Sequence, residues 1–448
     1  MSMSSPHETP APHWPTLWQA TRYWLLLGLI SFGGPAGQIA LMHRELVERR
    51  RWISESRFLH ALNYCMLLPG PEAQQLATYM GWLLHGRIGG IIAGGLFILP
   101  SVILLIALSA LYLQFGDLPW VAALFDGIKP AALALIILAC WRLGSRTLKH
   151  PLAWGMALAA LLNALFLHLA FPWVIGIAAI VGLIAQRSGS KAFSAGGHGS
   201  SHKDQPHEPA LIDDHSPLPA HASPSRKQIA ALLVCGALLW LLPFGLLLGN
   251  DGLSSVATFF SKAALVTFGG AYAVLPYVFD AAVNQYQWMT PHQMLDGLAL
   301  GESTPGPLII IVTFIGFLGG WQQAMLGADS LLAGGVAGAL VATWFTFLPS
   351  FVFILLGAPW VESTRQIPSL AAAMAAISAT VVGLIVHLAL VFGWHLFLPH
   401  AFSQLPDMFA VGTCIMAVWL LHVRQWSVLK VIGLSAALGL VNFGASLL

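Results

Sequence analysis

The sequence predicts an all-α integral membrane protein made of two inverted-topology repeats with broken or re-entrant helices. Three observations predict this class: an apolar composition, motifs that recur at one spacing, and opposite charge in the two loops that match under that spacing. Hydrophobic residues make up 57% of the chain and charged residues 8%, against roughly 25% charged in soluble domains. The net charge of +2 is too small to indicate a nucleic-acid partner.

Apolar stretches close to the roughly 20 residues that cross a bilayer recur along the chain. The tail at 1–16 has neither the basic segment nor the apolar segment of a cleaved signal peptide, so we expect the first membrane segment to direct insertion. The clearest crossing candidates are 91–113, 119–141, 151–169, 173–185, 229–248, 331–356, 370–392, 408–421 and 428–448.

Several motifs occur twice, and most pairs have the same spacing. Phe32-Gly33-Gly34 recurs as Phe268-Gly269-Gly270, Trp52 as Trp288, and Pro69-Gly70-Pro71 as Pro305-Gly306-Pro307, each 236 positions later. Leu99-Pro100-Ser101 recurs as Leu348-Pro349-Ser350 after 249 positions. Such self-similarity indicates two homologous halves, at 17–186 and 254–448, and we expect the two Phe-Gly-Gly motifs and the two tryptophans to be structural.

The segment at 187–227 joins the halves and is rich in Ser, Gly, Pro and His, without an apolar run. This composition predicts a disordered linker, followed by a connecting transmembrane helix at 228–253. The scattered spacing of its histidines favours a solvated linker over a metal site, and no cofactor is expected. These histidines are His198, His202, His207, His215 and His221.

The loops that follow the two Phe-Gly-Gly motifs differ in charge. The first carries Arg44, Arg49, Arg50, Arg51 and Arg57, whereas 280–293 has no Lys or Arg. Because basic loops stay in the cytoplasm, matched loops of opposite charge bias indicate inverted repeats, which are common in secondary transporters. We predict nine full crossings, four re-entrant elements, a cytoplasmic N-terminus and an external C-terminus, with broken full spans as the alternative to re-entrant hairpins.

The two Pro-Gly-Pro triplets, 69–71 and 305–307, interrupt long apolar runs. Proline ends one helix and suits the first turn of the next, and a bilayer tolerates broken backbone only where protein or a water-filled cavity receives its polar groups. The half-helices that start there have free N–H groups, which bind anions. The substrate-binding candidates are Pro69, Gly70, Pro71, Glu72, Gln74, Gln75, Ser303, Thr304, Pro305, Gly306 and Pro307.

Arginines that precede the first triplet suggest a vestibule that attracts anions, formed by Arg44, Arg49, Arg50 and Arg51. The alternative is a solvated helix end whose charged side chains pair with one another. Ionisable residues in membrane segments suggest function, so the coupling candidates are Glu302, Asp296, Asp126 and Lys129. Glu302 is the best proton carrier among them. Asp126 and Lys129 are spaced to pair with each other, and pairing and ion contact both stay open. The sequence contains no catalytic motif and no phosphate-binding loop, so we expect a transporter driven by an ion gradient rather than an enzyme.

The motifs themselves resemble a known family. Phe32-Gly33-Gly34-Pro35, the run from Val47 to Trp52, the run from Leu68 to Ala77, and Phe268-Gly269-Gly270-Ala271-Tyr272 resemble the chromate ion transporter family in its long, two-domain form. The resemblance covers nearly the whole chain except the linker and the tail.

The resemblance implies export of chromate across a bacterial plasma membrane, driven by the proton motive force, and chromate resistance. The implied partners are chromate or a sulfate-like oxyanion, protons and the lipid bilayer, and a homodimer is left open. A carrier of sulfate or another oxyanion is the first alternative, and an anion channel is the second. The second half has Ala271 in place of Pro35 and Leu308 in place of Glu72, so the halves are expected to contribute unequally to the site.

Overall fold

The computed structural model describes residues 13–188, 193, 210–213, 216, 221, 225–268, 270–361, 368–398 and 406–447. Within these ranges the chain forms helices, turns and one isolated bridge between Ile53 and Ile212. Most of the predicted tail, Gly269 and four of the five linker histidines lie outside the described residues.

The first half contains seven α-helices and two π-helical segments among its described residues. They are α1 (Leu17–Ile30), α2 (Gly34–His43), η1 (Arg44–Arg49), α3 (Glu55–Cys65), α4 (Glu72–Phe115), α5 (Pro119–Thr147), α6 (Pro151–Leu162), η2 (Asn163–Leu167) and α7 (Phe171–Arg187). The connecting helix α8 (Arg226–Leu247) follows.

The second half repeats this order with one added break. Its elements are α9 (Asp251–Val266), α10 (Ala271–Phe279), η5 (Asp280–Gln285), α11 (Pro291–Ser303), η6 (Leu308–Ile310), α12 (Ile311–Gln322), η7 (Ala328–Ser330), α13 (Leu331–Val361), α14 (Pro368–Phe397), α15 (Met408–His422) and α16 (Val428–Ser446). At the start of α11, Thr290 caps the helix and Gln293 completes a capping box after Pro291, as the local sequence predicts.

Six helices of the described chain are long and apolar enough to cross a membrane, which confirms a multi-pass all-α protein. They are Glu72–Phe115, Pro119–Thr147, Arg226–Leu247, Ala328–Pro359, Leu370–Phe397 and Val428–Ser446. The predicted spans at 151–169, 173–185 and 408–421 form shorter apolar helices. The count of nine crossings therefore stays a prediction.

Helix α4 is a hairpin rather than one straight rod. His85 and Gly86 leave helical geometry, with φ of −135° and 64°. The two arms then pack so closely that a Cβ on Gly81 would lie 2.4 Å from the carbonyl oxygen of Gly89. In the second half, α12 and α13 form the matching hairpin, where a Cβ on Gly316 would lie 2.3 Å from the carbonyl oxygen of Gly338.

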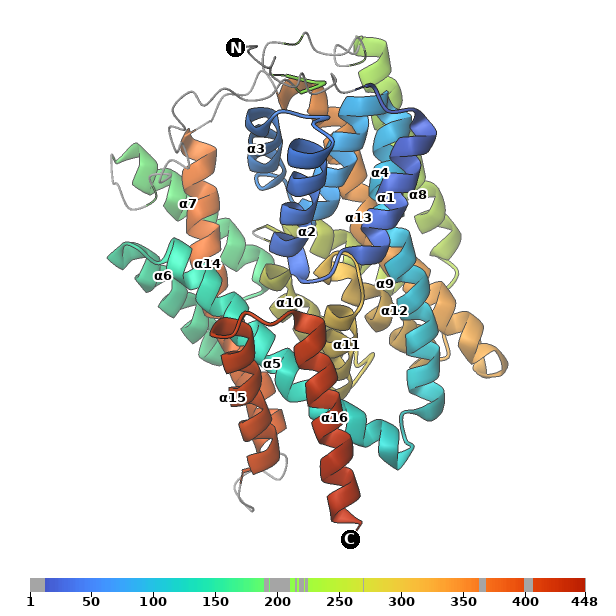
Figure 1. Ribbon diagram of the computed structural model, residues 1–448, viewed down its shortest axis with the longest axis vertical. Helices are drawn as coiled ribbons and strands as arrows, with labels where there is room; N and C mark the ends of the chain where they lie inside the picture. The colour runs from blue at the N-terminus through green and yellow to red at the C-terminus, as the bar shows by residue number, and fades with distance from the viewer. Residues whose placement is uncertain are drawn as a thin grey trace, which may run out of the picture.

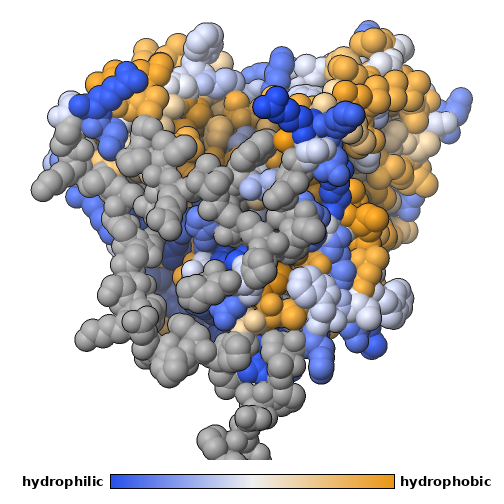
Figure 2. Space-filling view, turned by 90° about the horizontal axis from the view of Figure 1, so that it is seen from above, coloured by the Kyte–Doolittle hydropathy of each residue, from blue (hydrophilic) through white to orange (hydrophobic). Residues whose placement is uncertain are grey.

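The reversal in α4 lies at the same end of the molecule as the start of α1, because His85 Nε2 is 2.8 Å from the carbonyl oxygen of Pro15. In Figure 1, α3 also lies at this end, and α16 ends at the opposite one. Figure 2 looks onto the upper end; among the residues drawn in colour, hydrophilic side chains lie scattered between apolar ones, which gather most densely along the right-hand side. The chain therefore runs along α3, reverses at the first triplet and returns along the first arm of α4, so that these two arms form a hairpin. The re-entrant placement of this hairpin in the membrane stays a prediction.

The two halves exchange helices with each other. Helix α5 of the first half packs against α15 and α16, whereas α14 of the second half packs against α6 and α7. Figure 1 shows α14 beside α7 and shows α5 among α15 and α16. Each outer bundle therefore contains a long helix from the other half, so neither half is a self-contained body.

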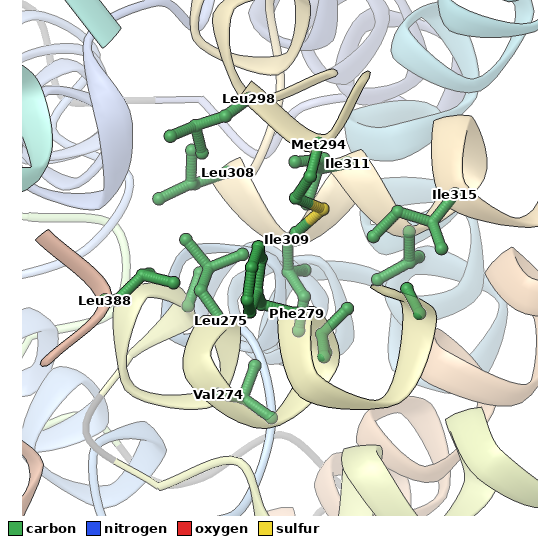
Figure 3. Close-up of a cluster of buried hydrophobic side chains, with 14 of the residues drawn as sticks. Val274, Leu275, Phe279, Met294, Leu298, Leu308, Ile309, Ile311, Ile315 and Leu388 are labelled. Atoms are coloured by element: carbon green, nitrogen blue, oxygen red, sulfur yellow. The ribbon is translucent and has the colours of Figure 1, made fainter. Parts of the chain in front are cut away.

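The largest hydrophobic core lies around the second triplet. Figure 3 shows Leu308 and Ile309 of η6 facing Leu275 of α10, with Leu388 of α14 beside them. Leu308 and Ile309 are each 2% exposed. This packing holds the start of the helix after the second triplet in one place.

The described part of the linker departs from the expected disorder. Leu211 and Ile212 donate backbone hydrogen bonds to the carbonyls of Arg51 (2.9 Å) and Trp52 (3.1 Å), and Ile212 accepts one from Ser54 (3.1 Å). Ile212 is 2% exposed. The loop before α3 offers backbone groups that no helix uses, and two apolar linker residues satisfy them. We name residues 210–213, 216 and 221 the strap.

Candidate functional site

The two triplets lie at the interface between the halves and make reciprocal hydrogen bonds. The Gly70 N–H donates to the carbonyl of Thr267 at 2.7 Å, and the Gly306 N–H donates to the carbonyl of Ser31 at 2.8 Å. Thr267 and Ser31 directly precede the Phe-Gly-Gly motifs. Each triplet is therefore held by the residue that precedes the Phe-Gly-Gly motif of the opposite half. These bonds bring both triplets to the interface between the halves.

Both triplet glycines are required by geometry. Gly70 and Gly306 have φ of 130° and 102°, a region that side chains disfavour. A Cβ on Gly70 would lie 2.2 Å from Ser350 Oγ, and one on Gly306 would lie 2.0 Å from Ser101 Oγ. Neither position can hold a larger residue without displacing a serine of the other half.

Ser101 and Ser350 are site residues that the sequence reasoning missed. Ser101 Oγ donates to the carbonyl of Pro305, and both serines are buried. They end the repeated Leu-Pro-Ser motif. The repeat of this motif indicates duplication, and its polar residue is the signal in the sequence that points to the site.

Three buried glutamines surround the triplets. Gln75 Nε2 donates to the carbonyl of Pro69 at 2.8 Å, Gln74 Nε2 to Thr78 Oγ1 at 3.0 Å, and Gln38 Nε2 to the carbonyl of Ser31 at 3.2 Å. Gln38 was also missed by the sequence reasoning. The Oε1 atoms of all three make no hydrogen bond with any described residue, nor does the Oγ of Ser350.

Unpartnered buried polar atoms cost free energy, so this cluster is suited to a polar guest. An amide that rotates by half a turn presents its NH₂ group in place of its oxygen. The helix starts add backbone donors, because Pro71 before α4 and Pro307 before η6 provide no side-chain cap. The Ser303 and Thr304 hydroxyls instead donate to the carbonyls of Leu300 and Gly301, at 2.9 Å each, so they must rotate before they can donate to a guest.

Three of the four predicted coupling residues lie together, and the fourth, Glu302, lies apart from them. Asp296 and Glu302 are both on α11. Asp296 accepts a hydrogen bond from the Tyr112 hydroxyl at 2.8 Å and lies 3.5 Å from Lys129 Nζ. Lys129 also pairs with Asp126 at 3.0 Å, so the structure joins Asp126, Lys129 and Asp296.

Glu302 stands apart from this ion-pair cluster, on the same helix. It is six residues further along α11, which is about 9 Å of helix, and it accepts a hydrogen bond from the Tyr272 hydroxyl. Glu302 is 5% exposed and Asp296 is 4% exposed. The tyrosine partners Tyr112 and Tyr272 are not predicted by the sequence, because they lie on other helices, 184 and 30 positions away from their carboxylates.

The predicted vestibule arginines form local contacts. Arg49 and Arg50 both pair with Glu45, at 2.5 and 3.4 Å, and the Arg51 carbonyl accepts the Leu211 N–H of the strap. Two cavities stand out in the described part of the molecule, and no triplet residue lines either of them. In this conformation each triplet is held against the opposite half by the hydrogen bond of its glycine.

The tryptophans and the described glycines of the Phe-Gly-Gly motifs lie at buried positions and at breaks between helices, and their structural role stays a prediction. Trp52 is 6% exposed and Trp288 is 2% exposed. Gly33, Gly34 and Gly270 have positive φ values, which end α1 and α9 sharply before α2 and α10 begin.

Comparison with known proteins gives a consistent set of relatives. The family model described as Chromate transporter matches residues 18–183 and 254–440. A chromate transport protein of Cupriavidus metallidurans is 29% identical over 371 residues, covering 83% of this chain and 81% of the relative. One from Pseudomonas aeruginosa is 34% identical over 368 residues, covering 81% and 77%. A probable chromate transport protein of Synechococcus elongatus is 27% identical over 380 residues, covering 84% and 85%. No solved structure matches the chain.

Proposed function

This chain belongs to the chromate transporter family, and from that premise we propose that it is a secondary active transporter that exports chromate, or a similar tetrahedral dianion, across the bacterial inner membrane. The proton motive force drives export, and export confers chromate resistance. The observation that carries this proposal is the pair of hydrogen bonds by which each triplet is held against the opposite half, with unpartnered buried polar atoms beside them.

The proposed binding site lies between the triplets. First-turn N–H groups of α4 and η6, together with the amides of Gln74 and Gln75, serve as neutral donors to the four oxygens of the dianion. Helix starts favour negative charge, and buried neutral donors suit an anion that must later leave. The first half contributes more donors because its glutamines are replaced by Ile310 and Ile311 in the second.

The membrane potential is a sufficient driving force by magnitude. Moving one elementary charge through 100 mV is worth about 2.3 kcal/mol. Outward movement of two negative charges from a negative interior therefore releases about 4.6 kcal/mol. This energy can maintain a chromate concentration outside the cell that is more than about a thousandfold higher than inside. Glu302 and Asp296 are proposed to carry protons, so that the pH gradient drives export in addition to the membrane potential.

Access alternates when the triplet hairpins separate on one side at a time. The hydrogen bonds from Gly70 and Gly306 must break and re-form in each cycle. Since α5 and α14 are exchanged between the halves, the proposed moving units are the mixed bundles rather than the sequence repeats.

Labelled chromate uptake into inverted vesicles tests the proposal. Vesicles with a positive, acidic interior should accumulate chromate, and an uncoupler should abolish accumulation. Gln74→Ala should lower the rate about tenfold or more, as expected for a lost hydrogen bond to a charged group, whereas Gln186→Ala at the end of α7 should not.

Three outcomes would overturn parts of the proposal. Uptake that is unchanged after the gradient collapses would contradict coupled transport. A clear preference for sulfate over chromate would replace the substrate. Flux that never saturates with concentration would indicate an anion channel.

A further inference from the structure

A cavity of about 370 Å³ lies between α1 and the turn formed by α2 and η1. Leu26, Ile30 and Leu41 form an apolar wall, and Arg44, Arg49 and Arg50 form a basic rim. We name this feature the basic cavity. It is separate from the triplets, because no triplet residue lines it.

Two residues of the apolar wall, Leu26 and Ile30, face away from the protein core. Leu26 is 51% exposed and Ile30 is 45% exposed, and their neighbours Leu25 and Leu29 are 41% and 49% exposed. A helix surface of exposed leucines and isoleucines would be unfavourable against water. In a membrane protein such a surface is suited to acyl chains.

The rim carries more positive charge than its neighbours neutralise. Glu45 is the acidic residue that lines the cavity, and it pairs with both Arg49 and Arg50. One carboxylate among three guanidinium groups leaves an excess of two positive charges. Arg50 is also held in place by the rings of Tyr23 and Trp52, each 5.0 Å from its guanidinium carbon.

The second half shows that the fold does not need these charges. At the positions matching Arg44, Arg49 and Arg50 it has Asp280, Gln285 and Tyr286. The Tyr286 ring stacks on Trp288 at 4.6 Å and meets Phe259 at 5.9 Å, where Arg50 meets Trp52 and Tyr23. The uncharged Tyr286 ring packs against these aromatic rings in the place that the Arg50 guanidinium takes in the first half. The packing therefore does not require a positive charge, and the charge in the first half serves another purpose.

We propose that the basic cavity binds the phosphate group of an anionic phospholipid, with the acyl chains lying along Leu26 and Ile30. Basic pockets at the cytoplasmic ends of membrane helices recognise such head groups, and guanidinium groups suit phosphate oxygens. The inference uses the cytoplasmic placement of this end and does not depend on which ion is transported. It also assigns Arg44, Arg49 and Arg50 to lipid instead of to a substrate vestibule.

Native mass spectrometry of the full chain, released from nanodiscs that contain phosphatidylglycerol and phosphatidylcholine, tests the site. The protein should retain phosphatidylglycerol with about a tenfold or greater preference. The double substitution Arg49→Gln with Arg50→Tyr copies the second half, so it should fold normally and lose most of this preference. Arg226→Gln, outside the cavity at the start of α8, is the matched control and should keep it.

Arg44→Gln provides a second variant if the double substitution does not fold, and it should reduce the preference several-fold. Inorganic phosphate is the competing probe, and millimolar phosphate should not displace the lipid. Displacement by phosphate would indicate a site for a free anion and overturn the lipid assignment. Equal retention of both lipids by the unmodified protein, or an unchanged preference in the folded variants, would also overturn it.

Discussion

At the residue scale, the contact between the halves depends on two glycines that could not be exchanged for any other residue without strain. Gly70 and Gly306 combine positive φ with serine oxygens at the place where a side chain would begin. Most other polar groups at the site have several rotamers, whereas these two backbone N–H groups point in one direction. The alignment of the triplets therefore depends on these positions.

Gly70→Ala and Gly306→Ala should each destabilise the protein by about 1–3 kcal/mol, from the unfavourable φ and the clash with serine. Transport should fall with them. Gly95→Ala in α4 is the control, because a Cβ there would meet nothing within 4 Å. Thermal unfolding in detergent measures the effect, and equal melting temperatures for all three variants would contradict this account.

Glu302 is the residue on which proton coupling should depend. Glu302→Gln keeps the Tyr272 contact but cannot exchange a proton, so chromate uptake driven by the membrane potential should persist while stimulation by a pH gradient disappears. Tyr272→Phe should weaken the stimulation without removing it. Glu48→Gln, at an exposed carboxyl 3.1 Å from His43, should behave as the unmodified protein. A normal response to the pH gradient in Glu302→Gln would remove Glu302 from the coupling path.

At the element scale, the described residues of the strap contact both the start of α3 and the first arm of α4. Besides the bridge at Ile212, the Arg57 guanidinium donates to the Ser216 carbonyl at 2.7 Å, and the rings of His221 and Trp82 meet at 5.3 Å. These contacts span both arms that flank the first triplet. The strap therefore holds the start of α3 and the reversal of α4 together.

Ile212→Asp should detach the strap, because it would bury a carboxylate among apolar side chains. Hydrogen exchange at the Ser54, Leu211 and Ile212 amides should accelerate about tenfold or more, with little change in global unfolding. Ile212→Val keeps the packing and costs only about 0.5–1.5 kcal/mol, so its exchange should stay close to that of the unmodified protein. Unchanged protection in Ile212→Asp would show that the side chain does not hold the strap.

The strap should also loosen in acid. Burial lowers the pKa of His221, and the nearby His85 lowers that pKa further. A histidine with a lowered pKa stabilises the docked state when neutral, so its contribution is present above the ordinary pKa near 6.5 and is lost as the pH falls below it. Amide protection of the strap should therefore decrease between about pH 7 and pH 5. His221→Phe should remove that pH dependence, and a strap equally protected at both pH values would contradict it.

At the scale of the whole molecule, the exchange of α5 and α14 makes the halves depend on each other. The long helix of each half completes a bundle formed by the last two helices of the other. Separation of the halves would expose the packed faces of α5 and α14, and also those of the helices against which they pack. The chain should therefore fold as one unit although its sequence is duplicated.

A chain divided within the linker, between residues 200 and 201, tests this dependence and leaves the strap on the second fragment. The two fragments should assemble when produced together and should be degraded or aggregate when produced alone. Co-purification of a tagged first fragment measures assembly. A first fragment that is stable by itself would indicate that the exchanged helices are not needed for folding.

Local chemistry was predictable from the sequence because it depends on residues within one or two turns. The breaks at Pro69–Pro71 and Pro305–Pro307, the capping box at Thr290 and the pair between Asp126 and Lys129 are all of this kind. The membrane class follows from composition alone. The family followed from motifs that each occupy a few consecutive positions.

Only the tertiary structure decided which distant residues meet: Gly70 with Thr267, Ser101 with Pro305, Tyr272 with Glu302, and the strap with the loop before α3. The physical reason is that these helices are apolar on every side. A helix in water reveals its buried face by the periodicity of its apolar residues, but a helix in lipid has no such periodicity. Its partners are set by glycine contacts and by hydrogen bonds between residues that lie from 30 to 204 positions apart, and local sequence patterns do not reveal such pairs.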